Sequence, residues 1–246
     1  MVNQIFPDSL SPEELDDFLA QGWYRMGQHL FTLDYIYLDD WIRVFWLRFR
    51  LKNHTFSPKH RQLIAKNKRF NYSISALDIS EEHEDLYELY YKNIDFEASG
   101  SASEFLFGSD LFTTSAGNIF DSKMIEVRDG QKLIALGVFD LGKDCIAGIL
   151  NFFHPDYKKY SLGKYLILKK IEFAQNLGLP WYYPGYIGHN FSKFDYKLFP
   201  GKDNAEIFEP FSKLWLPYSE KQVELLNNSQ KYFFKLLPID LNEAGI

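Results

Sequence analysis

A turn in front of a long apolar helix is the place where this sequence best prepares the backbone for chemistry. The turn follows an apolar stretch that ends in FFHPD, and its residues are Tyr160, Ser161, Leu162, Gly163, Lys164 and Tyr165. The first N–H groups of a helix lack partners within the helix, so they can bind anions and developing oxyanions. Glycine lets a ligand approach these amides closely. A plain strand–helix turn has the same pattern, but the position favours a donor-binding site.

Several titratable side chains lie near this turn in the sequence. Glu172 lies inside the apolar helix, where an ionised carboxylate needs a partner, so it is either a buried structural anchor or an acid of the site. His154 and His189 are candidate bases, although a single histidine is more often structural. The other histidines lack metal-ligand spacing, and Cys145 is the single cysteine. We therefore expect no disulfide, no bound metal and no cofactor.

The elements that must position the turn occur in a defined order. Residues 124–141 form a hairpin pattern around Asp129-Gly130, and residues 145–154 predict a third strand. A buried helix is predicted over 162–176, and a further strand over 181–187. This order is the core plan of acetyltransferase-like domains. We therefore expect an α+β protein with a GNAT-like (acyl-CoA N-acyltransferase-like) mixed sheet flanked by helices.

Capping signals and apolar periodicity predict the remaining elements. Helices are expected from Pro12 to Gly22, over 57–67, over 80–93 and over 219–236, with serines at or just before each start. Strands are expected within 23–33 and over 41–51. The final part, 193–246, reads as loops around the last helix. We divide the chain into an N-terminal region (1–75), a GNAT-like catalytic domain (76–210) and a C-terminal helical extension (211–246).

Composition limits the classes of partner. The net charge is −6, so RNA binding would need a local basic patch. Residues 52–70 supply one, because they hold six lysines and arginines and no acidic residue. Aromatic residues make up 18% of the chain, which predicts a core rich in rings. The start has no secretory pattern, and no apolar run could span a membrane, so we expect a cytoplasmic protein without membrane contact.

Short motifs over 150–197 resemble the C-terminal signature of the aminoacyl-tRNA–protein transferases (arginyl/leucyl-tRNA–protein transferases). The matching segments are the turn at 160–165, Ile171-Glu172, Gly178-Leu179-Pro180, Gly185-Tyr186 and Lys193-Phe194-Asp195-Tyr196-Lys197. Weaker similarity lies at 126–130, 152–156 and 56–59. The resemblance covers about residues 10–200.

The resemblance implies transfer of an aminoacyl group, Arg or Leu, from aminoacyl-tRNA to the N-terminal amine of an acceptor protein, which marks that protein for degradation (N-degron tagging). Charged tRNA and the acceptor N-terminus would be the partners. An aminoacyl ester is already activated, so no enzyme nucleophile is required. On this basis the catalytic residues would be Lys193, Tyr196 and Glu172, the donor would bind at 160–165, and the acceptor would contact Tyr186, His189 and Lys197.

Two departures from the family pattern keep alternatives open. Family members usually carry cysteines in the N-terminal quarter, which some use to hold a cluster, whereas residues 33–43 here contain none. Family members also commonly have Arg just before the S-L-G motif, where this chain has Tyr160. The alternatives are an acyl-CoA-dependent GNAT N-acyltransferase and a non-catalytic binding relative. The transferred group, the acceptor, the oligomeric state and the role of the last 40 residues stay open.

Overall fold

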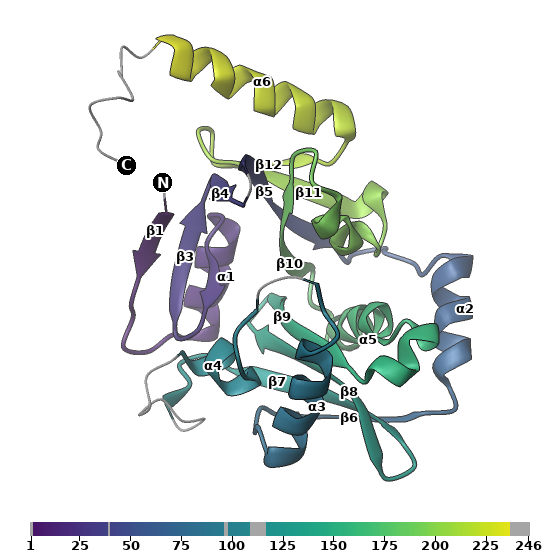
Figure 1. Ribbon diagram of the computed structural model, residues 1–246. Coiled ribbons are helices and arrows are strands. Elements are labelled where there is room, and N and C mark those ends of the chain that lie inside the picture. Colours follow the sequence, from purple (N-terminus) through teal and green to yellow (C-terminus); the bar gives the residue numbers. More distant parts are fainter. Residues whose placement is uncertain (1, 39, 96–97, 109–116, 237–246) are drawn as a thin grey trace.

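The computed structural model, which describes residues 2–38, 40–95, 98–108 and 117–236, is built around a nine-stranded mixed sheet (Figure 1). The strand order is β12-β11-β5-β10-β9-β8-β7-β6, and β4 pairs with β5 off this path. The strands are β4 (Tyr35–Tyr37), β5 (Trp41–Arg50), β6 (Asn71–Ala76), β7 (Ser122–Asp129), β8 (Lys132–Leu141), β9 (Cys145–Phe153), β10 (Trp181–Gly188), β11 (Ala205–Glu209) and β12 (Leu214–Pro217). Among the described strands, only β9 and β10 pair in parallel.

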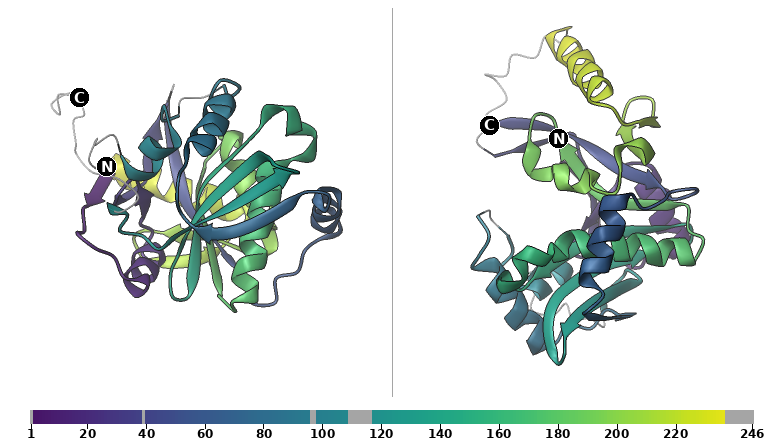
Figure 2. Two further views of the ribbon diagram at one scale, coloured as in Figure 1. Left: turned by 90° about the horizontal axis from the view of Figure 1, so that it is seen from below. Right: turned by 90° about the vertical axis from the view of Figure 1, so that its right-hand side faces the viewer.

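Helices cover both faces of this sheet (Figure 2). On one face, the apolar helix α5 (Leu162–Asn176) packs on β8 and β9, and α2 (Pro58–Asn67) lies beside it. On the other face lie α3 (Glu81–Tyr91) and α4 (Ala102–Phe107). Nine of the fifteen residues of α5 are buried, because its apolar positions surround the helix and leave little polar face.

A second, three-stranded sheet stands against the same face as α3 and α4. Its order is β1-β3-β2, from Val2–Ile5, His29–Leu33 and Tyr24–Met26. Helix α1 (Pro12–Ala20) packs on it, and Ser11 and Glu14 form a capping box at its start. Tyr24 and Leu30 of this sheet enter one core cluster with Trp46, which belongs to the central sheet. The N-terminal region is therefore packed directly against the centre of the molecule.

The prediction of loops between 193 and the last helix is wrong. Two 3-10 turns, η3 (Ser192–Leu198) and η4 (Lys202–Asn204), lead into β11 and β12, which extend the central sheet beyond β5. Both strands are short, so their alternation was too brief to read. The last helix, α6 (Glu220–Leu236), begins as predicted, with the Ser219 hydroxyl accepting from the Gln222 amide at 3.0 Å. Residues 237–246 of the predicted extension lie outside the described residues.

The predicted mixed α+β architecture of GNAT type is confirmed. The hairpin β7–β8, the strand β9, the helix α5 and the strand β10 follow in the expected order. The central sheet contains strands from both sides of the predicted boundary at residue 75, because β5 lies between β11 and β10. The division into three regions therefore stays a prediction about sequence, since strands from all three share one sheet. No helix among the described residues is long and apolar enough to cross a membrane.

Candidate active site

The parallel strands β9 and β10 separate after three paired residues, and we call their diverging parts (residues 148–153 and 184–188) the fork. Pairing ends at Tyr183 and Ala147. The next residue of β10 is Pro184, which has no N–H to donate to the ladder. Both strands also bulge here: Ile149 is an extra residue of β9 against β8, and β10 shifts its register against β5 between Tyr182 and Gly185. Pro184 and the two bulges therefore open the sheet at this point.

A buried lysine holds the bulge of β9. Lys170 of α5 is fully buried, and its ammonium donates to the carbonyl oxygens of Val138 at 2.6 Å and Leu150 at 3.2 Å. Burial lowers the pKa of Lys170 to about 7, although the Asp140 carboxylate opposes the shift. No sequence pattern marks this lysine as a site residue, because a lysine on a helix is usually exposed. Its position within the apolar run of α5 is the signal that could have found it.

The start of α5 presents free backbone amides, as the sequence predicted. The N–H groups of Leu162, Gly163 and Lys164 have no hydrogen-bond partner within the described residues, and the Ser161 side chain does not cap the helix. Ser161 itself has a left-handed conformation, with φ of 51°. The side chains of Leu162 and Tyr165, however, lie in the core. We therefore retain the amides and remove these two side chains from the predicted donor contacts.

Lys197 of η3 lies against the fork from the side of β10. Its ammonium donates to the Tyr186 carbonyl oxygen at 2.9 Å and lies 4.6 Å from the centre of the Tyr186 ring. It has no carboxylate partner within the described residues. Burial lowers the pKa of Lys197 to about 8. Gly185, with φ of 98°, brings the β10 backbone up to this group, because a Cβ there would lie 3.2 Å from the ammonium.

Aromatic side chains lie near the fork on η3, on α3 and at the end of β9, and Tyr196 lies on η3. Its side chain is 49% exposed, yet burial, with the Tyr90 and Tyr186 hydroxyls contributing, raises its pKa to about 12. The Tyr90 ring of α3 lies 5.5 Å from the Phe153 ring at the end of β9. Phe153 in turn is the nearest side chain to Gly163. Phe153 therefore borders the donor segment and Tyr90 packs next to it, and no sequence pattern marked either residue.

Two other predicted residues lie beside this arrangement. Lys193 is exposed on η3 and forms no ion pair within the described residues. The His189 ring lies 2.8 Å from the Glu224 carboxylate, so it contacts α6, and its backbone N–H donates to the Arg43 carbonyl oxygen. His189 therefore joins the end of β10 to the last helix.

Glu172 is not brought to the fork. Its carboxylate accepts from the Lys169 ammonium at 2.6 Å, and that ammonium lies 4.0 Å from the centre of the Tyr72 ring on β6. Strand β6 is four strands away from β10, or about 19 Å at the usual strand spacing. Glu172 is therefore the structural partner of Lys169, and we do not keep it as a catalytic residue.

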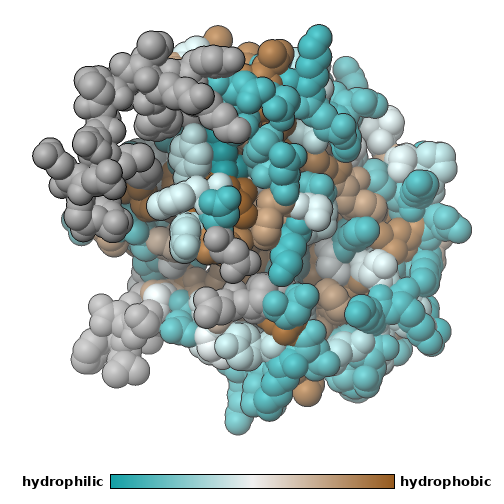
Figure 3. Space-filling model, turned by 45° about the horizontal axis from the view of Figure 1, so that its top comes forward, coloured by the Kyte–Doolittle hydropathy of each residue, from teal (hydrophilic) through white to brown (hydrophobic). Residues whose placement is uncertain are grey.

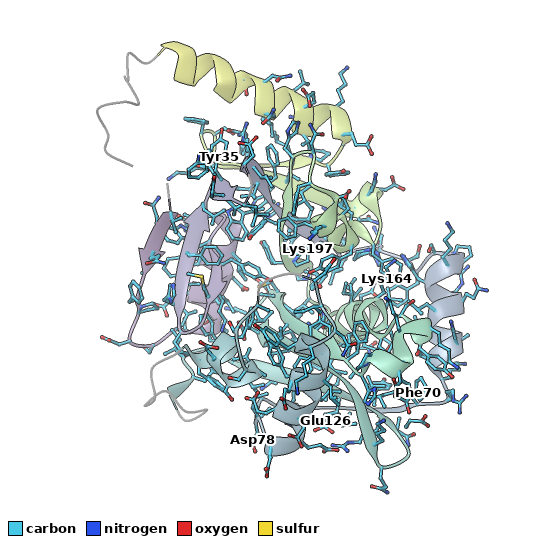
Figure 4. All side chains as sticks on the ribbon, viewed as in Figure 1. Tyr35, Phe70, Asp78, Glu126, Lys164 and Lys197 are labelled. Atoms are coloured by element: carbon cyan, nitrogen blue, oxygen red, sulfur yellow. The ribbon has the colours of Figure 1, made fainter. Side chains whose placement is uncertain are left out.

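A basic face surrounds the start of α5, formed by Lys66, Arg69, Lys159 and Lys164. The Lys66 ammonium donates to the Lys159 carbonyl oxygen, and Arg69 donates to the Tyr160 hydroxyl at 3.4 Å. None of the four cations pairs with a carboxylate in the part of the chain that the structure describes. In the view of Figure 4, Lys164 lies between Lys197 and Phe70, the residue after Arg69. The predicted patch at 52–70 thus continues to the predicted donor segment.

Comparison with known proteins matches the part of the chain that builds this site. The family model "Arginine-tRNA-protein transferase, C terminus" matches residues 82–199, which include the fork, the donor segment and η3. An aspartate/glutamate leucyltransferase of Campylobacter jejuni is 24% identical over 192 residues, which are 77% of this chain and 78% of the relative. One from Leptospira interrogans is 27% identical over 218 residues, which are 84% of this chain and 79% of the relative. These matches bear out the predicted resemblance to the aminoacyl-tRNA–protein transferases.

The matches also agree with the prediction of an enzyme of the aminoacyltransferase class. Among solved structures, FemX aligns with 9% identity and a TM-score of 0.42, over 78% of this chain and 65% of that chain. L-PGS from Bacillus licheniformis aligns with 13% identity and a TM-score of 0.39, over 58% of this chain and 48% of that chain. The assignment of the fold rests on the strand order of this chain and not on these distant structures.

Proposed function

We propose that the enzyme transfers leucine from leucyl-tRNA to the N-terminal amine of proteins that begin with an acidic residue, in the cytoplasm, and so marks them for degradation. The observation that carries the proposal is the fork. It joins free amides at the start of α5, suited to an acyl donor, to a lysine whose pKa is about 8. The match to the family model supports the reaction class, and the names of the relatives support leucine and acidic acceptors.

The proposed chemistry needs only placement and proton transfer. The neutral α-amine attacks the ester carbonyl, a C–N bond forms, and the bond to the ribose oxygen breaks. Neutral Lys197 takes the proton from the amine, and a proton returns to the ribose oxygen as it leaves. The amides at Gly163 stabilise the oxyanion, which is worth about 3–4 kcal/mol for each donor. The Tyr196 hydroxyl keeps its proton, since its pKa is about 12, and donates a hydrogen bond.

The residues that line the fork favour leucine over arginine as the transferred group. An arginyl side chain needs a carboxylate partner when it leaves water. The side chains named at the fork are aromatic or cationic: Tyr90, Phe153, Tyr196 and Lys197. An apolar side chain packs on such rings without an unpaired charge. In this proposal Lys193, which is exposed on η3, attracts an acidic acceptor residue, and the basic face binds tRNA phosphates.

A transfer assay with a matched pair of variants tests the proposal. The purified protein is incubated with tRNA charged with labelled leucine or arginine and with peptides that begin with Asp or Ala. We expect leucine on the Asp peptide only. Gly163→Trp covers the free amides, so kcat/KM falls about 100-fold or more, as for loss of an oxyanion donor. Gly163→Ala is the control, because a Cβ at this position meets Phe153 at an ordinary 3.4 Å.

Two results would contradict the proposal. One is the absence of transfer from any charged tRNA. The other is acylation of the peptide by acyl-CoA in the same assay, which would identify the donor as acyl-CoA. Arginine transfer would keep the reaction class and overturn the choice of leucine.

A further inference from the structure

The branch point of the fork is occupied by a side chain from the N-terminal sheet. Tyr24 of β2 is buried, and its hydroxyl donates to the carbonyl oxygen of Gly148 at 2.6 Å and to that of Tyr183 at 3.0 Å. These two carbonyls belong to β9 and β10 at the point where the strands separate. A single hydroxyl, from a part of the chain more than 120 residues away, therefore joins the two arms of the fork.

The contact gives a hydrogen-bond donor to backbone carbonyls at the place where the two strands separate. When a strand pair separates, the carbonyls at the branch point lose their ladder partners, and a buried carbonyl without a partner is costly. The Tyr24 hydroxyl supplies a donor at this place, and its single proton is shared between the two oxygens. Lys170 supports β9 in addition, through the Leu150 carbonyl, from the helix α5.

The Tyr24 ring is itself held in place by the central sheet. It stacks on the Trp46 ring of β5 with centres 5.5 Å apart. Trp46 contacts the edge of the Tyr186 ring at 5.2 Å, and the Tyr186 carbonyl accepts from the Lys197 ammonium. A continuous series of contacts thus runs from the N-terminal sheet to the lysine of the site.

We propose that Tyr24 is a positioning residue, whose hydroxyl fixes the branch point and so sets the distance between the donor amides and Lys197. The inference rests on the proposed function, and it makes the N-terminal sheet part of the catalytic apparatus without contact to substrate. Removal of the hydroxyl alone, in Tyr24→Phe, leaves the ring packing on Trp46 and leaves the two carbonyls without a donor.

The test compares Tyr24→Phe with Tyr87→Phe in the full-length protein. Tyr87 of α3 is also buried, and its hydroxyl also donates to a backbone carbonyl, that of Ser99 at 2.8 Å, which lies outside the fork. Both variants should lower Tm by a similar amount. Tyr24→Phe should lower kcat about 10- to 100-fold with little change of KM for tRNA, because misplacement by about 1 Å has that effect. Tyr87→Phe should leave kcat within about twofold of the wild type.

Amide hydrogen exchange gives a readout that is independent of transfer activity. Exchange within residues 145–150 and 181–187 should be faster in Tyr24→Phe and unchanged in Tyr87→Phe. Wild-type kcat in Tyr24→Phe, or equal exchange in the two variants, overturns the inference. If the wild type transfers nothing from any charged tRNA, the proposed function fails, and the exchange comparison still decides whether Tyr24 holds the fork.

Discussion

Two lysines with lowered pKa values show how their surroundings change what a residue type can do. Both Lys170 and Lys197 donate to backbone carbonyls, and burial lowers the pKa of each, to about 7 and about 8. Lys170 is enclosed between α5 and the sheet, so it can only hold structure. Lys197 lies beside the exposed Tyr196, where a substrate amine can approach it. The same residue type therefore has a structural use at one position, and we propose a catalytic use at the other.

Lys197 leads to a prediction about pH. The reaction needs the neutral amine of Lys197, and the fraction of Lys197 in this form rises as pH passes through about 8. The value of kcat at saturating substrates should therefore rise over pH 7–9. Lys197→Arg stays charged at these pH values and should lower kcat about 100-fold or more. A pH series of kcat for the two proteins checks this. An unchanged rising limb in Lys197→Arg would show that another group titrates.

Lys170 leads to a prediction about stability. In the unfolded chain its pKa returns toward 10.5, so between pH 7 and 10.5 the unfolded state binds more protons than the folded state. The free energy of unfolding should therefore rise with pH in this window, by about 2 kcal/mol at most between pH 7 and 9. Lys170→Met should lack this part of the rise. It should also be less stable by about 1–3 kcal/mol, because two carbonyls lose their donor. Urea unfolding at several pH values measures both effects.

At the scale of elements, the fork depends on how β10 turns away from β9. Pro184 ends the ladder, and Gly185 follows with a positive φ that other residues rarely adopt. The residues of β10 itself therefore favour its separation from β9, independently of tertiary contacts. Figure 1 shows the result, with β10 continuing toward β5 and β11 while β9 stays with β8.

A pair of glycine variants separates strain from function at this element. Gly185→Ala adds a Cβ 3.2 Å from the Lys197 ammonium at a φ of 98°. Gly178→Ala adds one at a φ of 74° with no atom within 4 Å. Both should lose about 1 kcal/mol of stability, because alanine is strained at positive φ. Only Gly185→Ala should also lower kcat, since it displaces Lys197. Urea unfolding and a transfer assay on both variants measure this, and equal kcat values would contradict the role given to Gly185.

At the scale of the whole molecule, an acidic protein presents a local basic face. Figure 3 shows one face as largely hydrophilic, with smaller apolar areas between. The net charge of −6 repels RNA at long range, so tRNA binding must depend on the basic face beside the donor amides. The α2 and α5 helices bring its parts together from residues 66–69 and 159–164.

Charge reversal on this face tests the placement of tRNA. Lys66→Glu combined with Lys159→Glu should raise KM for charged tRNA about tenfold or more at 0.1 M salt, and the slope of log KM against log salt should decrease by about 1–2. Lys92→Glu is the control, because Lys92 pairs with Glu88 on α3 away from this face. The control changes the net charge by half as much, so a change in log KM half that of the double variant would show that only net charge matters.

Much of the fold and part of the site could be predicted from local patterns. The long helix α5, the hairpin β7–β8 and the strands β9 and β10 were predicted because periodicity, turn residues and capping serines are local properties of the chain. The free amides at Gly163 belong to the same class, since any uncapped helix start has them. Strands β11 and β12 were missed, because short strands depend on pairing partners that are distant in the sequence.

The sequence by itself predicted the type of fold, the resemblance to a transferase family and the proposed donor segment, since each of these rests on motifs that are contiguous in the chain. Only the tertiary structure decided which side chains meet at the fork. It placed Glu172 away from the fork, and it brought Tyr24, Tyr90 and Lys197 to the fork from three distant parts of the chain. The physical reason is that burial and the pKa of a side chain depend on neighbours in space, which residue order does not specify.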